Sequence, residues 1–396
     1  MDKNKFVFVD KQEIEEEVFR KSLTYWQDAW RRLKKHKLAM LGLVGVILII
    51  LVGIFGPMLT SFSYSDQVND YKNLPPRLDL YKIDDNTFIY FSGDYFLFSV
   101  TEDGKLIKKL ELPKENKDVI NKIYTYVLDG EPVILDFSYN LLPGKKGYDY
   151  DYTLEYKGNI TYEKYKTVSN KIYPFGTDSL GRDMLTRTMY GARISLLVAL
   201  IATLVNFIIG VTYGAIAGYE GGRKDNIMMR VVDIINSIPL VLYVILLMVL
   251  IGNHGLWTII IALGSVYWVG MARLVRGQML ALKEQEFVLA ARTLGVSKRK
   301  IIVRHLIPNA MGPIIVAMTM MIPSAVFTEA FLSFIGLGVS APMASWGTLA
   351  NNALSGLITY PYQLFFPAFA IALTMLAFNF LGDGLRDALD PRLRKG

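Results

Sequence analysis

Cysteine is absent from this chain of 396 residues, and histidine occurs only three times. Without a thiol the chain can form no disulfide, no thiolate metal site and no cysteine nucleophile. The histidines, His36, His254 and His305, are too scattered to match metal-ligand spacing. The sequence contains no P-loop pattern G-x-x-x-x-G-K-[ST] and no serine in a nucleophile-elbow context. We therefore expect a chain that is not an enzyme and that binds no ATP, metal or other cofactor itself.

Charge is scarce as well, because 20% of the residues are charged and 52% are hydrophobic. This profile is typical of a polytopic membrane protein with some water-exposed mass. A helix rises about 1.5 Å per residue, so a run of about 20 apolar residues crosses roughly 30 Å of hydrocarbon. Six such segments are predicted: Leu38–Leu59, Ser195–Tyr219, Ile234–Ile251, Gly255–Ala272, Ala310–Thr328 and Phe365–Leu381. Within the third, Pro239 is more typical of a kink than of a site.

The basic residues lie on one side of this predicted bundle. They cluster just before the first apolar segment, in the loop of residues 280–309 and in the tail, at Arg392, Arg394 and Lys395. From Ala330 to Gly382, by contrast, there is no charged residue. The positive-inside rule then places both termini and the loop in the cytoplasm and residues 60–172 outside it. The positive charge needs no nucleic acid to explain it.

Residues 1–37 contain an apolar stripe at helical spacing. Its members recur at steps of four and three residues: Phe19, Leu23, Trp26, Trp30 and Leu33. We expect a cytoplasmic amphipathic helix that lies in the membrane interface, in contact with lipid, or docks on the rest of the protein. Both can hold together.

Residues 60–172, between the first two predicted spans, read as a small β-rich domain. Aromatic and branched runs alternate with Gly-Asp and Asp-Gly pairs, which is the best short-range signal for hairpins. The predicted strands are Phe88–Ser92, Tyr95–Val100, Lys105–Leu112, Ile123–Leu128 and Val133–Phe137. Most of the chain's tyrosines lie here, and they suit either a protein-facing surface or the domain's own core.

The most informative segment is EFVLAARTLGVSKRKIIVRHLIPN, from Glu286 to Asn309. Helix formers from Lys283 to Leu294 end at Gly295, a natural C-cap, and Ser297 can cap a second helix that runs to Pro308. Ala290 and Ala291 leave a shallow surface that another protein can approach closely. A short helix that protrudes in this way can transmit force from a soluble partner, although a solvated helical hairpin without a partner is the plainer alternative.

A second motif, PFGTDSLGRDMLTRTMYGARISL, leads from the β-rich insert into the second span, from Pro174 to Leu196. Gly176 and Gly181 allow a tight turn. Asp178 and Asp183, beside Arg182 and Arg187, offer local ion pairs that can fix the chain at the membrane surface. A third motif, after the fifth span, contains Pro342, Ser345, Trp346 and Gly347.

Together these motifs resemble the inner-membrane permeases of ABC importers. Ala290, Ala291, Gly295 and Pro308 match the family's cytoplasmic coupling loop, in which Glu286 opens the helix. The signature before the second span matches the dipeptide, oligopeptide and nickel permeases of the C type (DppC/OppC-like), at Gly176, Thr177, Asp178, Gly181, Arg182 and Asp183. The resemblance covers residues 1–59 and Pro174 to the end, but not the insert. It implies the fold of a type I ABC importer permease, with residues 38–59 as the first transmembrane helix and residues 173–396 as a five-helix permease core.

The resemblance also implies partners and a mechanism. The chain would form half of a pathway through the bacterial cytoplasmic membrane, together with a homologous second permease. Two cytoplasmic ABC ATPases, which bind ATP and Mg²⁺, would drive it through the coupling loop. An extracytoplasmic solute-binding lipoprotein would deliver the peptide substrate.

Polar residues inside the fifth span mark a candidate lining of that pathway. Ser324 and Thr328 are four residues apart and share one helix face. Glu329 stands out because an ionisable group in hydrocarbon costs a few kcal/mol. Two alternatives for Glu329 are hydrogen bonds between helices and an ion pair with Arg182 or Arg187.

Other function classes stay open from the sequence. The same machinery carries nickel chelates or other small solutes in parts of the family. A secondary transporter would show internal repeats and ion-coupling residues in its spans, of which there is little here beyond Glu329. A membrane-anchored receptor would need no basic helical loop.

Overall fold

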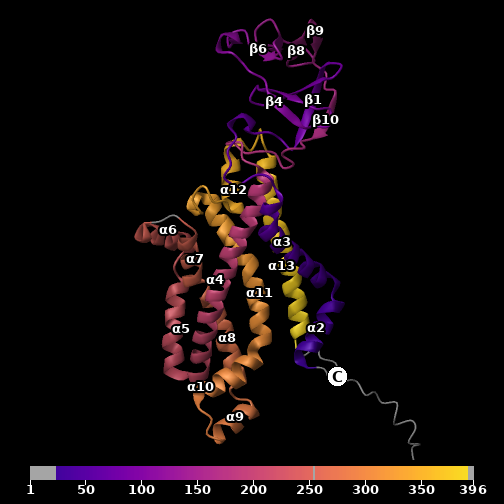
Figure 1. Cartoon of the computed structure of the whole chain (residues 1–396). Helices are drawn as coiled ribbons and strands as arrows, with labels where there is room; N and C mark the ends of the chain where they lie inside the picture. The colour runs from indigo at the N-terminus through magenta and orange to yellow at the C-terminus, as the bar shows by residue number, and fades with distance from the viewer. Residues whose placement is uncertain (1–23, 253–254, 391–396) are drawn as a thin grey trace, which may run out of the picture.

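The computed structural model describes residues 24–252 and 255–390. A bundle of long helices forms one body, and a β-rich domain stands at one end of it (Figure 1). The predicted stripe residues Phe19 and Leu23, the tail residues Arg392, Arg394 and Lys395, and His254 lie outside the described residues.

Within the described residues, five helical stretches are long and apolar enough to cross a membrane. The first, second and last are the single helices α3 (Lys37–Leu59), α4 (Met184–Glu220) and α13 (Tyr362–Leu389). The third joins α7 (Leu256–Val266) to α8 (Trp268–Leu282). The fourth runs from Lys298 to Leu337 through α10 (Lys298–Lys300), η4 (Ile301–Leu306), α11 (Ile307–Leu332) and η5 (Ser333–Leu337). The chain is thus an integral membrane protein of the predicted helical class.

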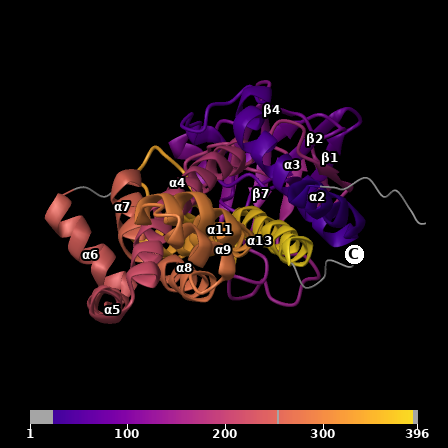
Figure 2. The same ribbon diagram turned by 90° about the horizontal axis from the view of Figure 1, so that it is seen from below.

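The predicted span Ile234–Ile251 differs from the rest. The structure has α5 (Gly222–Asn236) and α6 (Leu240–Ile251) at this place, bent by 84° at the break between them. Pro239 ends the turn and precedes α6, which agrees with its interpretation as a kink. The two helices count as a sixth span only if the bent pair is taken as one. They lie on the side of the bundle away from α3 and α2 (Figure 2).

Helix packing in the bundle depends on small residues. Gly42 of α3 lies so close to α13 that a Cβ there would stand 2.6 Å from the carbonyl oxygen of Ala377. Gly214 of α4 lies against the backbone of Ala272 in α8 in the same way. Such close approach is how helices associate where lipid removes the hydrophobic drive between them.

The part of the predicted N-terminal helix that the structure describes has two different faces. α2 (Tyr25–Lys35) begins at Thr24, which forms a capping box with Gln27. Leu33 is buried, and the Tyr25 hydroxyl donates to the carbonyl of Leu389 at 3.0 Å, so the helix docks on the end of α13. Trp26 and Trp30 are exposed, as a membrane-interface face requires. The docking alternative therefore describes the buried face, and contact of the exposed face with the membrane interface stays a prediction.

The β-rich insert consists of two five-stranded antiparallel sheets. One has the order β10-β1-β2-β3-β4 and the other β5-β6-β7-β8-β9. The strands are β1 (Arg77–Asp84), β2 (Thr87–Phe91), β3 (Leu97–Val100), β4 (Leu106–Lys109), β5 (Lys117–Asp118), β6 (Ile123–Leu128), β7 (Glu131–Asp136), β8 (Thr153–Tyr156), β9 (Asn159–Thr161) and β10 (Lys166–Ser169). All five predicted strands are present, with ends that differ by a few residues, whereas β1, β5, β8, β9 and β10 were not predicted.

The hairpin signals in the insert act as expected. Asp129 and Gly130 both have positive φ, 51° and 89°, as a type I′ turn between β6 and β7 requires. Tyr81, Tyr126 and Tyr156 are buried in a core shared by the two sheets, as the core alternative predicts. Tyr148 and Tyr162 are exposed, and their use as a protein-facing surface stays a prediction. Burial raises the pKa of Tyr126 above its ordinary value, as is usual for a phenol inside a core.

Candidate functional site

The helix α9 (Glu286–Thr293) projects from the end of the bundle opposite the β-rich insert (Figure 1). It ends in a Schellman motif. The backbone N–H of Gly295 donates to the carbonyl of Arg292 at 3.0 Å, and the N–H of Val296 donates to the carbonyl of Ala291 at 3.1 Å. Gly295 has φ of +73°. The predicted C-cap at Gly295 is confirmed, and its positive φ is the conformation that such a cap adopts. The helix itself starts at Glu286, because Lys283 still belongs to the end of α8.

The two alanines of this helix face different surroundings. Ala291 packs with Val288 into a core formed by α4, α8 and η4, whereas Ala290 is exposed. Phe287 and Leu294 are exposed too, Leu294 by 83%. Residues 287, 290 and 294 follow helical spacing, so they form one apolar strip that the bundle does not cover. The shallow surface is therefore Ala290 with its neighbours, and the expectation that Ala291 belongs to it was wrong.

Ion pairs and hydrogen bonds fix α9 and the residues after it to the end of α4. Lys298 forms an ion pair with Glu220 at 3.0 Å. Lys283 donates to the carbonyl of Gly218 at 3.1 Å, and the Arg292 guanidinium lies 5.3 Å from the ring centre of Tyr219. A push on α9 would thus reach α4 directly.

The second helix of the loop does not stop at Pro308. Ser297 occupies the N-cap position without a side-chain hydrogen bond, and the helix continues through Pro308 to Leu337. Proline removes an N–H and clashes with the carbonyl of the preceding turn. Residues 301–306 form a wider π-helical turn just before it, which accommodates the proline without ending the helix. The predicted end at Pro308 was therefore wrong.

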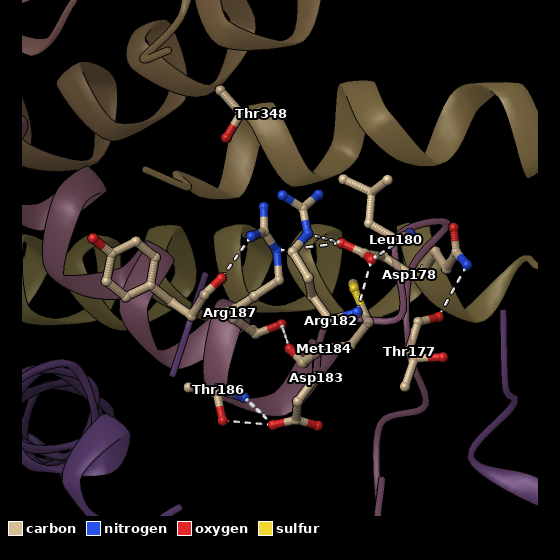
Figure 3. A network of polar contacts seen from close by, with 12 residues as sticks. Thr177, Asp178, Leu180, Arg182, Asp183, Met184, Thr186, Arg187 and Thr348 are labelled. Atoms are coloured by element: carbon tan, nitrogen blue, oxygen red, sulfur yellow. Dashed lines mark hydrogen bonds and ion pairs between the residues drawn. The ribbon is translucent and has the colours of Figure 1, made fainter. Parts of the chain in front are cut away.

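The signature before α4 forms a buried network of polar contacts (Figure 3), at the end of the bundle that adjoins the insert. Asp178 accepts hydrogen bonds from the backbone of Leu180 and Arg182 and from Nε of Arg182 at 2.7 Å. Arg187 lies 3.5 Å from the same carboxylate and donates to the carbonyl of Tyr64 at 2.8 Å. Asp183 makes no ion pair in the described structure. It caps α4 instead, by accepting from the backbone of Thr186 at 2.8 Å.

Thr177 ties three parts of the chain together. Its hydroxyl accepts from the N–H of Leu74 at 2.8 Å and donates to the carbonyl of Tyr71, both at the entry to the insert. Its carbonyl accepts from Tyr362 at 2.9 Å and Gln363 at 3.1 Å, at the start of α13. No local pattern in the sequence pointed to Tyr362 or Gln363, because they lie about 185 positions away.

Positions 176 and 181 require glycine for two reasons: their backbone conformation and the lack of room for a Cβ atom. Their φ values are +76° and +72°. A Cβ at either position would collide with a backbone carbonyl, that of Leu74 or of Val68. The tight turn predicted for them is present, and it brings the signature against the entry to the insert.

Of the three candidate pathway residues, Ser324 and Thr328 are neighbours on one helix face, whereas Glu329 is buried apart from them. Ser324 is exposed and Thr328 half-buried, and each hydroxyl donates to a carbonyl of its own helix. Glu329 is fully buried and accepts from Ser195 of α4 and Ser333 of η5, both at 2.7 Å. It forms no ion pair with Arg182 or Arg187. The alternative of hydrogen bonds between helices thus describes Glu329 in this conformation.

The third motif packs beside Glu329. Ser345 caps the short helix α12 (Trp346–Ala353). The backbone N–H of Trp346 donates to Ser195, and its indole N–H donates to the carbonyl of Thr188 at 2.9 Å. Ser195 was missed by sequence analysis, because serine is common in packed membrane helices. Among the described residues no group of three or more His, Cys, Asp or Glu side chains could hold a metal ion.

Two family models match the chain. Residues 210–395 match the binding-protein-dependent transport system inner membrane component, and residues 24–76 match the N-terminal TM domain of oligopeptide transport permease C. Together they leave out β1 to β10.

Relatives match over nearly the whole chain. The dipeptide transport system permease protein DppC of Bacillus subtilis is 42% identical over 379 residues, 96% of this chain and 89% of its own. The oligopeptide transport system permease protein OppC of the same organism is 40% identical, over 96% of this chain and 94% of its own. Such matches include the insert, which the sequence-based resemblance did not cover. OppC of Escherichia coli is 47% identical over 220 residues, 56% of this chain and 72% of its own.

Among solved structures, an inward-facing MetNI methionine ABC transporter is 19% identical with a TM-score of 0.43, over 52% of this chain and 98% of that one, a likeness too loose to carry an argument. The two Bacillus relatives decide the assignment, because each is well above 30% identical over almost its full length. The chain, an apolar helical bundle with a projecting basic loop and a β-rich insert, belongs to the DppC/OppC-like family of ABC importer permeases.

Proposed function

We propose that this permease carries dipeptides or oligopeptides into the cell as half of an ATP-driven pathway. The names of the relatives support the substrate class. The observation that supports the mechanism is the short helix α9 at one end of the bundle. Its apolar strip is exposed, and Ala291 and Val288 anchor it in the bundle's core. A partner can therefore bind the strip. The proposed coupling element includes Glu286, Ala290, Ala291, Gly295 and Pro308. Within it, Ala290 contacts the partner and Ala291 anchors the helix.

The partners follow from the same features. Two cytoplasmic ABC ATPases, with their ATP and Mg²⁺, would press on the strip of Phe287, Ala290 and Leu294. A homologous second permease would close the pathway, because Ser324 is exposed on α11, while Thr328 is half-buried against Tyr267 of this chain. An extracytoplasmic solute-binding lipoprotein would deliver the peptide at the opposite end.

The orientation belongs to the proposal. The N-terminal helix α2, the end of α13 and α9 lie at one end of the bundle, and the insert lies at the other (Figure 1). With basic residues gathered at the α9 end, the positive-inside rule puts both termini in the cytoplasm and residues 60–172 outside.

The test is transport by the assembled complex in proteoliposomes. We expect ATP to drive uptake of a labelled dipeptide or oligopeptide, and a non-hydrolysable ATP analogue to drive none. Uptake of a nickel chelate without uptake of peptide would overturn the substrate class. Absence of ATP-dependent uptake from a complex that holds all its subunits would overturn the proposed role itself.

A further inference from the structure

A cavity of about 340 Å³ lies between the N-terminal end of α4 and the segment that connects α11 to α12. Its polar side chains come from both sides: Arg182 and Arg187 from the signature, and Thr348, Asn351 and Asn352 from α12. The remaining lining comes mainly from η5 and the connecting segment and includes Ser333, Gly336, Gly338, Val339 and Met343.

The two arginines carry more positive charge than their surroundings neutralise. The side chains of Arg182 and Arg187 are 7% and 2% exposed. Among the described residues, Asp178 is the only acid within ion-pair distance of either guanidinium group. Nε of Arg187 is buried without a hydrogen-bond partner among the described residues. Asp183, the nearest other acid in sequence, points away from both guanidinium groups, which turn toward Thr348 (Figure 3).

The opposite wall cannot supply the missing counter-charge. The chain has no charged residue from Ala330 to Gly382, and this range includes η5, the connecting segment and α12. A buried charge without a partner is costly, so a site of this kind favours an anion that enters from outside the chain.

We propose that this cavity binds the C-terminal carboxylate of a peptide. One carboxylate neutralises the single surplus charge, and the planar guanidinium group presents a fork of donors that matches carboxylate geometry. Asn352 lines the same cavity at its exposed edge, whereas the Asn351 amide donates to the carbonyl of Phe334 and the Thr348 hydroxyl belongs to the capping box of α12. The inference rests on the proposed peptide transport and gives it a recognition site on this subunit.

Two substitutions alter the charge of the cavity in different ways. Arg182→Gln leaves Arg187 and Asp178 as a one-to-one ion pair. Asn352→Asp adds a carboxylate at the exposed edge of the cavity and leaves the signature intact, so it tests the idea even if the first variant folds poorly. Ser355→Asp adds the same charge three residues further along, outside the cavity lining, and is the matched control.

The measurement is KM for uptake of one peptide with a free C-terminus and of its C-terminal amide, in the full reconstituted complex. Each variant is compared with the wild type on the same peptide, so any preference of the solute-binding protein cancels. Charge-assisted hydrogen bonds of this kind predict a rise in KM of about tenfold or more for the free peptide in both variants, and little change for the amide. Ser355→Asp should alter neither.

Several results would overturn the inference. Equal effects of the variants on the free peptide and the amide would assign the arginines a structural role only. A response that appears only in vesicles with phosphatidylglycerol, and not in pure phosphatidylcholine, would assign the cavity to a lipid headgroup. Loss of the second permease from Arg182→Gln, with unchanged preference between the peptides, would assign it to an acidic side chain of that subunit. If no peptide is transported even by the wild type, the proposed function fails first.

Discussion

Ala290 and Ala291 are adjacent in sequence, yet α9 places Ala291 in the bundle's own core and Ala290 on the exposed strip beside Phe287 and Leu294. The two alanines therefore have different surroundings: Ala291 holds the helix in place, and Ala290 is the one that the proposed mechanism brings against the ATPases.

Substitution of the two alanines should have different effects. Ala290→Asp should leave thermal stability within about 0.5 kcal/mol of the wild type, as for other surface changes, and should abolish co-purification of the ATPases. Ala291→Asp buries an unpaired charge and should lower stability by a few kcal/mol before any partner binds. Thermal unfolding in detergent and pull-down of the ATPases measure both. Normal ATPase binding by Ala290→Asp would remove α9 from the coupling element.

Gly295 offers a test of backbone geometry alone. Its φ is +73°, and a Cβ there would meet no atom within 4 Å, so space does not limit the side chain. Gly295→Val should strain the Schellman end of α9 by about 1–2 kcal/mol and uncouple ATP hydrolysis from uptake. Gly295→Asn, which tolerates this conformation, should retain coupling. The ratio of ATP hydrolysed to peptide transported is the measurement, and equal ratios for both variants would contradict the argument.

Topology can be tested by single cysteines, because the chain contains no native cysteine. Ser169 at the end of β10 and Ser355 after α12 are exposed, so cysteines there should react with an impermeant thiol reagent from outside intact cells. A cysteine at the exposed Ser297 should react only after the cells are opened. Ser345 would be a poor choice, since it is fully buried. Labelling of Ser297 from outside would invert the orientation.

The role of the β-rich insert can be tested by excision, and the structure indicates where to cut. Arg77 and Ser169 face each other as Cα partners of β1 and β10, so a linker of a few Gly and Ser residues can replace the chain between them. Leu74 and Tyr71, which bond to Thr177, remain in place. If the insert receives the solute-binding protein, excision should leave basal ATP hydrolysis unchanged and lower its stimulation by the loaded binding protein. Unchanged stimulation and uptake would make the insert dispensable for transport.

The insert should lose stability in acid through Asp136. Burial opposes ionisation of this carboxyl, but hydrogen bonds from Ser138 and Lys145 outweigh it and hold the pKa below its ordinary value of 3.8. A carboxyl with a lowered folded-state pKa stabilises the fold above its unfolded-state pKa, and that stability is lost as pH falls through the folded value.

Protease resistance of the insert should therefore fall below about pH 4, and Asp136→Asn should remove part of this pH dependence. Asp129→Asn, which removes an exposed ion pair with Lys108, is the matched control and should change stability by less than about 1 kcal/mol. Identical acid profiles for wild type and Asp136→Asn would contradict the assignment.

Features with a local cause were predictable from the sequence. The apolar run of α3, the Asp129-Gly130 turn and the positive φ of Gly295 each depend on residues within a few positions. The facing of Ala290 and Ala291 was not predictable, because it depends on Met279 and Ile301 as packing neighbours from other helices. The same holds for the junction at Thr177 and for the cavity at Arg187, which join segments far apart in the chain. The helix continues through Pro308 because a π-helical turn precedes the proline, and no sequence pattern predicted that turn.

The 84° elbow between α5 and α6 affects whether either helix can cross the bilayer. At about 1.5 Å per residue, 15 residues of α5 and 12 of α6 reach only about 22 Å and 18 Å, and each falls short of a hydrocarbon layer of roughly 30 Å. A helix interrupted within the hydrocarbon layer leaves peptide groups that acyl chains cannot solvate. If the bent pair lies within the membrane, the carbonyls that the bend frees near Ser237 and Pro239 need partners from protein or water, which acyl chains cannot supply.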